Sequence, residues 1–260
     1  LPSYKVPKTI ALTANADIFR GDLKISKNKV SNFFDQLSFL NDHGLHTKFI
    51  GNFSKPLIIV LHGFMGQAED FYFLAENLAD NFCFALVDLP GHGQSQNGFK
   101  TWQDFDAYMV QSLNALELEY SLYGYSMGGR LAFNMAFKLT NPKHLILESA
   151  GPGLIDDEQR TNRIRFDQEL LKHISNKKQL DEFNSTWYDL DLFKGIKSSP
   201  HYNDMIQRRE LSNVQGWHES LQVYSLAKQD NLRKKLPIHT PVHYIYGEND
   251  HKYAQFAKEL

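Results

Sequence analysis

One five-residue pattern constrains the fold of this chain more than any other: Gly124-Tyr-Ser126-Met-Gly128 has the spacing Gly-x-Ser-x-Gly. Residues 119–123 before it can form a strand, and residues 127–139 after it carry apolar side chains at helical spacing. A strand that enters a helix through so tight a turn holds its central residue in a strained conformation, and flanking glycines avoid collisions. The pattern predicts a nucleophile elbow that exposes the Ser126 hydroxyl. The alternative is a serine in an ordinary glycine turn.

Strand and helix patterns alternate on both sides of this elbow. Apolar runs typical of buried parallel strands occupy residues 56–61, 82–87, 144–147 and 241–246, and residues 46–52 can form an outer strand. Helical patterns occupy residues 68–79, 101–116 and 127–139, with Thr101 as a candidate N-cap. This alternation predicts the α/β class, with a mostly parallel central sheet and helices on both faces.

The chain divides into four segments. The rhythm of strands stops between residues 154 and 235, where polar helical stretches predict an α-helical cap over the sheet. We expect a basic N-terminal arm and helix at 1–42, the first part of the core at 43–153, the cap at 154–235 and an incomplete second part of the core at 236–260. Because the chain ends as a helix begins at 252–260, we expect a final strand and helix to be missing.

Composition argues against several classes of partner. The net charge of -2 gives no support for binding to nucleic acid or to an acidic membrane surface. No apolar run approaches the roughly 20 residues that span a bilayer, and no basic-then-apolar leader begins the chain. The single cysteine, Cys83, lies in an apolar run and indicates neither disulfides nor export. We therefore expect a cytoplasmic globular protein, whose oligomeric state the sequence leaves open.

An elbow serine needs a base that a carboxylate holds in place, and in this architecture the chain order is serine, acid, histidine. Asp250 follows the last predicted strand, at the edge where catalytic groups collect, so we predict that it is the acid. The alternative is an aspartate that only forms a turn. His251 follows Asp250 directly, and neighbouring side chains diverge. We therefore expect the catalytic histidine to lie beyond Leu260.

Two backbone N–H groups would form the oxyanion hole. One belongs to Met127, directly after the serine, and the other to Phe64 in the loop that begins with His62. We expect His62, and His92 in a later glycine turn, to shape their loops rather than to act as bases.

Arg130 lies one helical turn after Ser126, on the same face of the helix. A guanidinium there is costly to bury unless a carboxylate or phosphate pairs with it, which predicts an anionic substrate. The alternative is a surface arginine that reaches an acidic neighbour. The predicted cap adds Arg160, Arg163, Arg165, Arg208 and Arg209.

Four motifs occur in this chain together with several shorter segments that lie between the third motif and the fourth. They are His62-Gly-Phe-Met-Gly66, Asp88-Leu-Pro-Gly-His-Gly-Gln-Ser95, Gly124-Tyr-Ser-Met-Gly-Gly-Arg130 and Tyr246-Gly-Glu-Asn-Asp-His-Lys-Tyr253, with Pro152-Gly-Leu154, Arg163, Trp187-Tyr188 and Arg209 between them. Over about residues 46–260, this combination resembles one branch of the α/β-hydrolase fold. That branch is the 2-succinyl-6-hydroxy-2,4-cyclohexadiene-1-carboxylate (SHCHC) synthases of menaquinone biosynthesis.

The resemblance implies a lyase that catalyses an elimination. In that family the serine acts as a base, removes a ring proton from 2-succinyl-5-enolpyruvyl-6-hydroxy-3-cyclohexene-1-carboxylate, and pyruvate leaves. The implied roles are Ser126 as the base and Asp250 as the residue that orients the histidine. The residues implied to bind this small polycarboxylate are Tyr125, Arg130, Arg163, Trp187 and Arg209. Neither a metal nor an organic cofactor is implied.

Two other functions stay open from the sequence. One is a serine esterase, thioesterase or carbon–carbon hydrolase that acts on an anionic small molecule. The other is a binding protein of the hydrolase fold without catalytic activity.

Residues 1–31 carry a second, shorter resemblance. Leu1-Pro-Ser-Tyr-Lys-Val-Pro-Lys8 and Gly21-Asp-Leu-Lys24 are similar to the C-terminal tail of acyl-CoA synthetases, although Leu23 stands where that family has glycine. We assign no activity to this arm, and a basic tail is the simpler interpretation.

Overall fold

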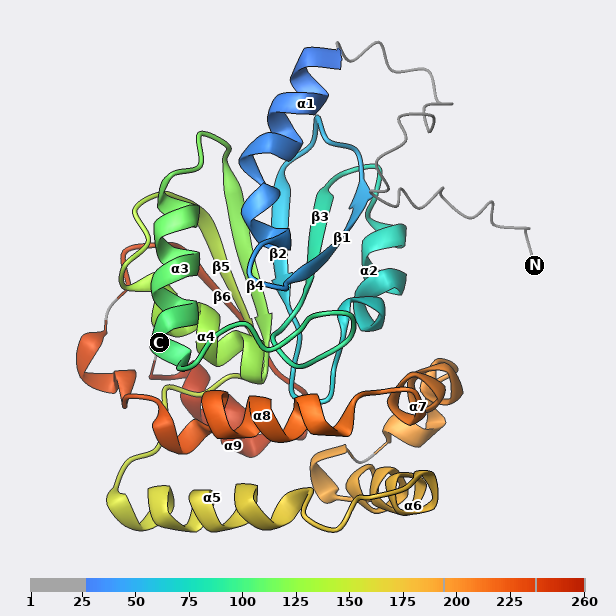
Figure 1. Cartoon of the computed structure of the whole chain (residues 1–260). Helices are drawn as coiled ribbons and strands as arrows, with labels where there is room; N and C mark the ends of the chain where they lie inside the picture. Colours follow the sequence, from blue (N-terminus) through green and yellow to red (C-terminus); the bar gives the residue numbers. More distant parts are fainter. Residues whose placement is uncertain (1–26, 194, 237, 260) are drawn as a thin grey trace.

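The computed structural model describes residues 27–193, 195–236 and 238–259. These residues form one six-stranded sheet with the strand order β1-β3-β2-β4-β5-β6. The strands are β1 (His46–Gly51), β2 (Leu57–Leu61), β3 (Cys83–Asp88), β4 (Tyr120–Tyr125), β5 (Pro142–Glu148) and β6 (Val242–Ile245). β1 is antiparallel to β3 at one edge, and all other neighbours are parallel (Figure 1). The prediction of a mostly parallel α/β sheet is confirmed.

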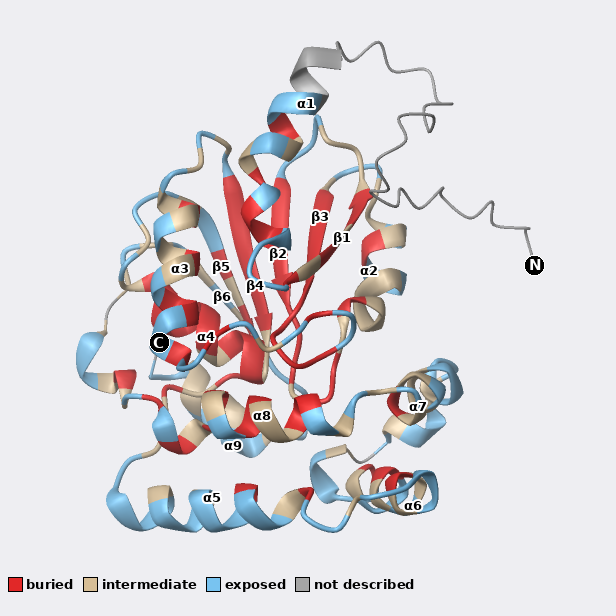
Figure 2. Ribbon diagram, viewed as in Figure 1, coloured by how far each residue is buried: buried red, intermediate tan, exposed pale blue. Residues whose placement is uncertain are grey.

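Strand β2 is apolar throughout, and β3 is apolar up to its last residue, Asp88, because helices cover both faces of the sheet. These helices are α1 (Lys27–Gln36), α2 (Tyr72–Asn77), α3 (Trp102–Asn114) and α4 (Met127–Ala136). Ile59 and Leu61 of β2 pack on the side of α1, α3 and α4, whereas Ile58 and Val60 pack on the side of α2. Every residue of β2 and β3 is buried, as Figure 2 shows in red. Side chains that alternate between two covered faces explain runs without a polar residue.

Local capping decides where two of the predicted helices begin. Thr101 caps α3 as expected, because its hydroxyl accepts the N–H of Asp104 (3.1 Å) and its own N–H donates to that carboxylate (3.0 Å). The helix predicted at 68–79 is divided into the 3₁₀ turn η2 (Ala68–Phe71) and α2. Asp70 accepts the N–H of Gln67 (3.1 Å), and this contact favours a tight first turn.

The described residues between 154 and 235 form helices and turns without a strand. The helices are α5 (Asp157–Leu170), α6 (Lys177–Trp187), α7 (Tyr202–Glu210) and α8 (Val214–Tyr224), and the 3₁₀ turns are η3 (Asp191–Phe193), η4 (Ile196–Ser198), η5 (Leu226–Lys228) and η6 (Leu232–Lys235). We call this segment the cap. It lies across one end of the sheet, with α8 nearest to the core and α5 farthest away (Figure 1). Most of α5 is exposed to solvent (Figure 2).

The core and the cap touch backbone to backbone at Gly91 and Gly216. A Cβ atom on Gly216 would lie 2.4 Å from the carbonyl oxygen of Gly91, and one on Gly91 would lie 2.3 Å from that of Gly216. Gly91 also has a φ of +78°, which favours glycine. The next residue along α8, Trp217, is buried. Helix α8 is therefore held directly against the core.

The chain returns from the cap to β6 and then enters α9 (His251–Ala257). The arm that resembles acyl-CoA synthetases lies almost entirely within residues 1–26, outside the described residues. An 18-residue helix of sufficient apolarity to cross a bilayer does not occur within the described part of the chain.

Candidate active site

The turn between β4 and α4 places Ser126 at the carboxyl end of the parallel strands. Its φ of 50° and ψ of -107° are unusual for a residue with a side chain. The N–H of Ser126 donates to the carbonyl oxygen of Glu148 at the end of β5 (2.8 Å), and that of Gly128 donates to His62 after β2 (3.0 Å). Neighbouring strand ends therefore hold the strained strand–turn–helix geometry that the sequence predicted.

Close contacts around the elbow explain its glycines. A Cβ atom on Gly128 would lie 2.2 Å from the carbonyl oxygen of Leu61. One on Gly63 would lie 2.9 Å from the ring of Tyr125 and 3.4 Å from the Cβ of Ser126. The loop after β2 therefore lies beside the serine, where an oxyanion hole requires it.

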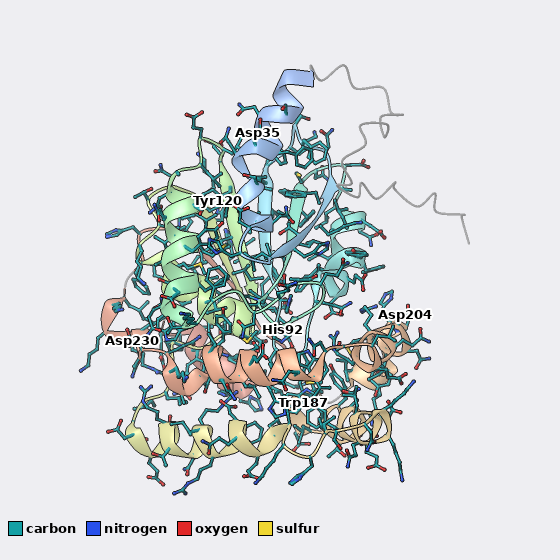
Figure 3. All side chains as sticks on the ribbon, in the orientation of Figure 1. Asp35, His92, Tyr120, Trp187, Asp204 and Asp230 are labelled. Carbon is teal, nitrogen blue, oxygen red and sulfur yellow. The ribbon has the colours of Figure 1, made fainter. Side chains whose placement is uncertain are left out.

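The two residues expected to form the oxyanion hole lie where the loop after β2 meets the elbow, Phe64 on the loop and Met127 on the elbow. Met127 is the first residue of α4, and the first N–H groups of a helix have no partner within the helix. The ring of Phe64 packs against Trp187 and Trp217 of the cap, with 6.3 Å between ring centres in each case. Figure 3 labels Trp187 in the cap and His92 at the end of the core that faces it. Phe64 of the core loop and Trp187 of the cap therefore form one continuous aromatic surface beside the elbow.

The two histidines of these loops have both ring nitrogens bound to backbone groups. Nδ1 of His62 donates to the Gly63 carbonyl (2.7 Å) and its Nε2 accepts the N–H of Leu89 (2.8 Å). His92 is held likewise, and its Nε2 accepts the N–H of Met65 (3.1 Å). Burial lowers the pKa of both rings, that of His92 to about 3. Both are therefore neutral and shape their loops, as expected.

Asp250 lies beyond the end of β6, at the same edge of the sheet as Ser126. It caps α9, and its Oδ1 accepts the N–H of Tyr253 (3.1 Å), a contact that a merely turn-forming aspartate would also make. His251 is exposed. Across residues 27–193, 195–236 and 238–259, no histidine forms a hydrogen bond with the side chain of Ser126 or Asp250.

Arg130, on α4, carries the least balanced charge of the site. Its Nη1 donates to Oε1 of Gln229 (2.7 Å), so its partner is a neutral amide and not the acidic neighbour of the alternative interpretation. The ion pairs within the described ranges do not include it. Burial lowers the pKa of Arg130 to about 10, and the positive charge of Arg163 contributes. The carboxylate of Asp167 acts on Arg130 from a distance but forms no ion pair with it, and a desolvated guanidinium without an ion pair can receive an anion.

Two further residues that the sequence analysis did not select lie near Arg130. Partial burial lowers the pKa of Lys252; the charge of Asp250 opposes this effect, and the charges of Arg163 and Arg130 add to it. The same arginines oppose the effect of burial, which raises the pKa of Tyr253. Arg163 itself pairs with Asp167 on α5 (Nε to Oδ1, 2.8 Å). Lys252 and Tyr253 end the same motif that contains Asp250, and this position in the sequence is the signal that could have identified them.

Arg209 is separate from this cationic group. It is buried, its Nη2 pairs with Asp70 (2.5 Å) and its Nε donates to the hydroxyl of Tyr188 (3.1 Å). Tyr125 is close to both groups: burial raises its pKa to about 12, and the hydroxyls of Tyr188 and Tyr253 contribute. The structure thus brings together Arg130 and Arg163 but engages Arg209 with the core.

These features define the chemistry that the site can perform. A serine hydroxyl stands beside two candidate N–H donors, and Arg130 lies one helical turn away, within reach of the charges of Arg163 and Lys252. Such a site can bind a carboxylate and can stabilise negative charge on an oxygen that faces Ser126. Of the residues that the structure describes, none belong to a cluster of three or more histidine, cysteine or carboxylate side chains that could hold a metal ion.

Comparison with known proteins gives one consistent family. Residues 56–259 match the family described as alpha/beta hydrolase fold. The 2-succinyl-6-hydroxy-2,4-cyclohexadiene-1-carboxylate synthase of Enterobacter sp. (strain 638) is 33% identical over 211 residues, which cover 79% of this chain and 80% of the relative. A protein of Haemophilus influenzae with the same name, qualified as putative, is 31% identical and covers 78% of this chain and 84% of its own length.

A solved structure agrees with these relatives. The structure of MenH from S. aureus superimposes with a TM-score of 0.74 at 27% identity, and covers 82% of this chain and 84% of the other. An enol-lactonase from Burkholderia xenovorans has a TM-score of 0.63 at 15% identity, a similarity that shows the fold alone.

Proposed function

This chain belongs to the SHCHC synthases of the α/β-hydrolase fold, and from that membership we propose that it is a lyase of menaquinone biosynthesis. Its substrate is 2-succinyl-5-enolpyruvyl-6-hydroxy-3-cyclohexene-1-carboxylate, and its products are SHCHC and pyruvate. Ser126 acts as the base, and Asp250 orients the histidine that activates it.

One observation carries the proposal. Arg130 lies one helical turn from Ser126 with a neutral partner, and the charge of Arg163 lies nearby. A site for a neutral ester would not place an uncompensated guanidinium beside its serine, because desolvation of that charge is costly. A substrate with several carboxylates supplies the missing counter-charges. Tyr125, Arg163 and Trp187 complete the binding residues that we propose, together with Arg209, whose buried Nη1 has no hydrogen-bond partner among the described residues.

The reaction balances without water. The oxygen of Ser126 removes a proton from the ring, the electron pair forms a ring double bond, and the carbon–oxygen bond to the enolpyruvyl group breaks. The leaving enolate takes up a proton and becomes pyruvate. The N–H groups of Phe64 and Met127 would stabilise negative charge that develops on an oxygen during these steps.

Release of pyruvate tests the proposal. The purified chain is incubated with the enolpyruvyl substrate, pyruvate is measured by a coupled assay, and a protein-free sample gives the spontaneous rate. We expect release above that rate that depends on Ser126, together with a ring product that is the diene SHCHC and is lighter by one water than a hydrolysis product. A ring product that carries a hydroxyl at the cleaved position would instead indicate a hydrolase.

A hydrolase of anionic esters or thioesters is the second candidate, because the elbow and its neighbouring loop also suit acyl transfer. Such an enzyme would form an acyl intermediate on Ser126. Mass spectrometry after incubation with an anionic aryl ester tests this: a stable adduct supports the hydrolase, whereas its absence together with pyruvate release supports the lyase. A binding protein would show neither reaction while it still binds the polycarboxylate.

A further inference from the structure

Both backbone polar groups of Gln229 form hydrogen bonds, and its side chain reaches Arg130 from this fixed position. The residue follows η5, where the cap returns toward the core, and it is only 6% exposed. Its N–H donates to the carbonyl of Leu226 (3.3 Å), and its own carbonyl accepts from Nη1 of Arg160 (3.2 Å). From this position its side-chain oxygen accepts Nη1 of Arg130 (2.7 Å).

The other half of the Gln229 amide is unused. Within the described residues, its Nε2 is buried and has no hydrogen-bond partner. A guanidinium is only a donor, so the amide must turn its oxygen toward Arg130 and its NH₂ away from it. Buried polar groups are nearly always paired, and an exception needs an explanation. An acceptor that the described residues do not supply, such as a ligand carboxylate, would satisfy this donor.

The neutral charge of Gln229 matters as much as its hydrogen bond. Arg163 already has a carboxylate partner in Asp167 (2.8 Å), whereas the partner of Arg130 is the neutral amide of Gln229. A glutamate at position 229 would match Arg130 in the same way and would repel an incoming carboxylate. An amide orients the guanidinium and leaves its full charge to the ligand.

We propose that Gln229 is a positioning and specificity residue for the anionic substrate: its oxygen orients Arg130 without neutralising it, and its NH₂ donates to a carboxylate of the bound substrate. This inference rests on the proposed function, which it extends to a residue outside the serine, acid and arginine motifs. It predicts that a negative charge at position 229 has opposite effects on stability and on affinity.

The test compares Gln229→Glu and Gln229→Met with a matched control. Gln207→Glu introduces the same charge at an exposed position of α7. Calorimetry measures binding of SHCHC and, separately, of succinate, and thermal unfolding measures Tm. For Gln229→Glu we expect a Tm equal to or above that of the unmodified chain and an affinity at least tenfold lower. For Gln229→Met we expect a smaller loss of affinity, and for Gln207→Glu no loss.

The outcomes distinguish a failure of the Gln229 inference from a failure of the proposed function. If Gln229→Glu lowers Tm and affinity together, the role is structural and the inference is wrong; unchanged affinity also overturns it. If the unmodified chain binds succinate but not SHCHC, the proposed substrate is wrong, and the Gln229 comparison is still read from succinate. If it binds neither ligand, both proposals fail.

Discussion

Arg209 of the cap and Asp70 of the core form an ion pair, with 2.5 Å between Nη2 and Oδ2. The neighbouring Arg208 bonds to the other oxygen of the same carboxylate (2.9 Å). Both arginines lie in the last turn of α7, and Asp70 follows the loop that carries Phe64. One carboxylate therefore joins the cap to the loop of the proposed oxyanion hole.

Removal of the Asp70 charge should loosen this connection. Asp70→Asn leaves a buried guanidinium without its counter-charge, so we expect the free energy of unfolding to fall by about 2–4 kcal/mol in urea titrations at neutral pH. Asp204→Asn, an exposed change on the same helix, should alter it by less than about 1 kcal/mol. Equal effects of the two substitutions would show that the pair does not stabilise the cap.

The ion pair between Asp70 and Arg209 should make the free energy of unfolding depend on pH in the acidic range. Burial alone would raise the pKa of Asp70, but the charges of Arg209 and Arg208 and their hydrogen bonds outweigh it and hold the pKa below 3.8. A carboxyl with a depressed folded-state pKa stabilises the fold above its unfolded pKa, and this contribution is lost as the pH falls below it. The difference between the unmodified chain and Asp70→Asn should therefore shrink below about pH 4.

Ser126 should be replaceable by glycine with a gain in stability. Its φ of 50° is unfavourable for any residue with a Cβ, so Ser126→Gly should raise the free energy of unfolding by about 1 kcal/mol. Ser126→Ala keeps the Cβ and is the matched control, with unchanged stability. Both variants should lose essentially all release of pyruvate. A glycine variant less stable than the alanine variant would contradict the interpretation of strain.

Arg130 should matter for binding but little for folding. Arg130→Met removes a charge that no carboxylate balances, so stability should stay within about 1 kcal/mol of the unmodified chain, while kcat/KM falls by the equivalent of about 2–5 kcal/mol. Arg165→Met, an exposed change on α5, should leave kcat/KM unchanged. A large loss of stability in Arg130→Met would indicate a structural arginine instead.

The buried imidazole of His92 should destabilise the fold at mildly acidic pH. Burial lowers the pKa of His92 from 6.5 to about 3, so the unfolded chain binds a proton that the folded chain does not. Stability is therefore greatest above about pH 6.5 and falls below it by up to about 1.4 kcal/mol per pH unit. His92→Gln should flatten this slope in unfolding measured across that range. An unchanged slope would assign the effect to other groups.

Added imidazole should accelerate the 260-residue chain. No histidine of the described residues forms a hydrogen bond with the side chain of Ser126, and a triad serine without its base is slower by several powers of ten. We expect slow release of pyruvate that rises with imidazole concentration and reaches a plateau, and no response in Ser126→Ala. A rate without imidazole that equals that of the Enterobacter relative would overturn this prediction.

Local features were predictable from the sequence, and contacts between distant segments were not. The elbow depends on glycines within a few residues of Ser126, and the N-cap of α3 depends on Thr101 and Asp104 alone. The partners of Arg209 and Arg130 are different. Asp70 and Gln229 reach them only after the cap has docked on the core, and nothing in the local sequence of either arginine indicates which residue that will be.

The paired glycines of the core and the cap restrict how this protein can vary. Gly91 and Gly216 let the two backbones touch, so a side chain at either position would collide with the carbonyl oxygen of the other and push α8 away from the core. Trp217, the residue after Gly216, packs on the ring of Phe64 (6.3 Å) and would move with it. Two residues without a side chain therefore set the alignment of the loop beside Ser126. An alanine at either position should lower activity although neither residue contacts the substrate.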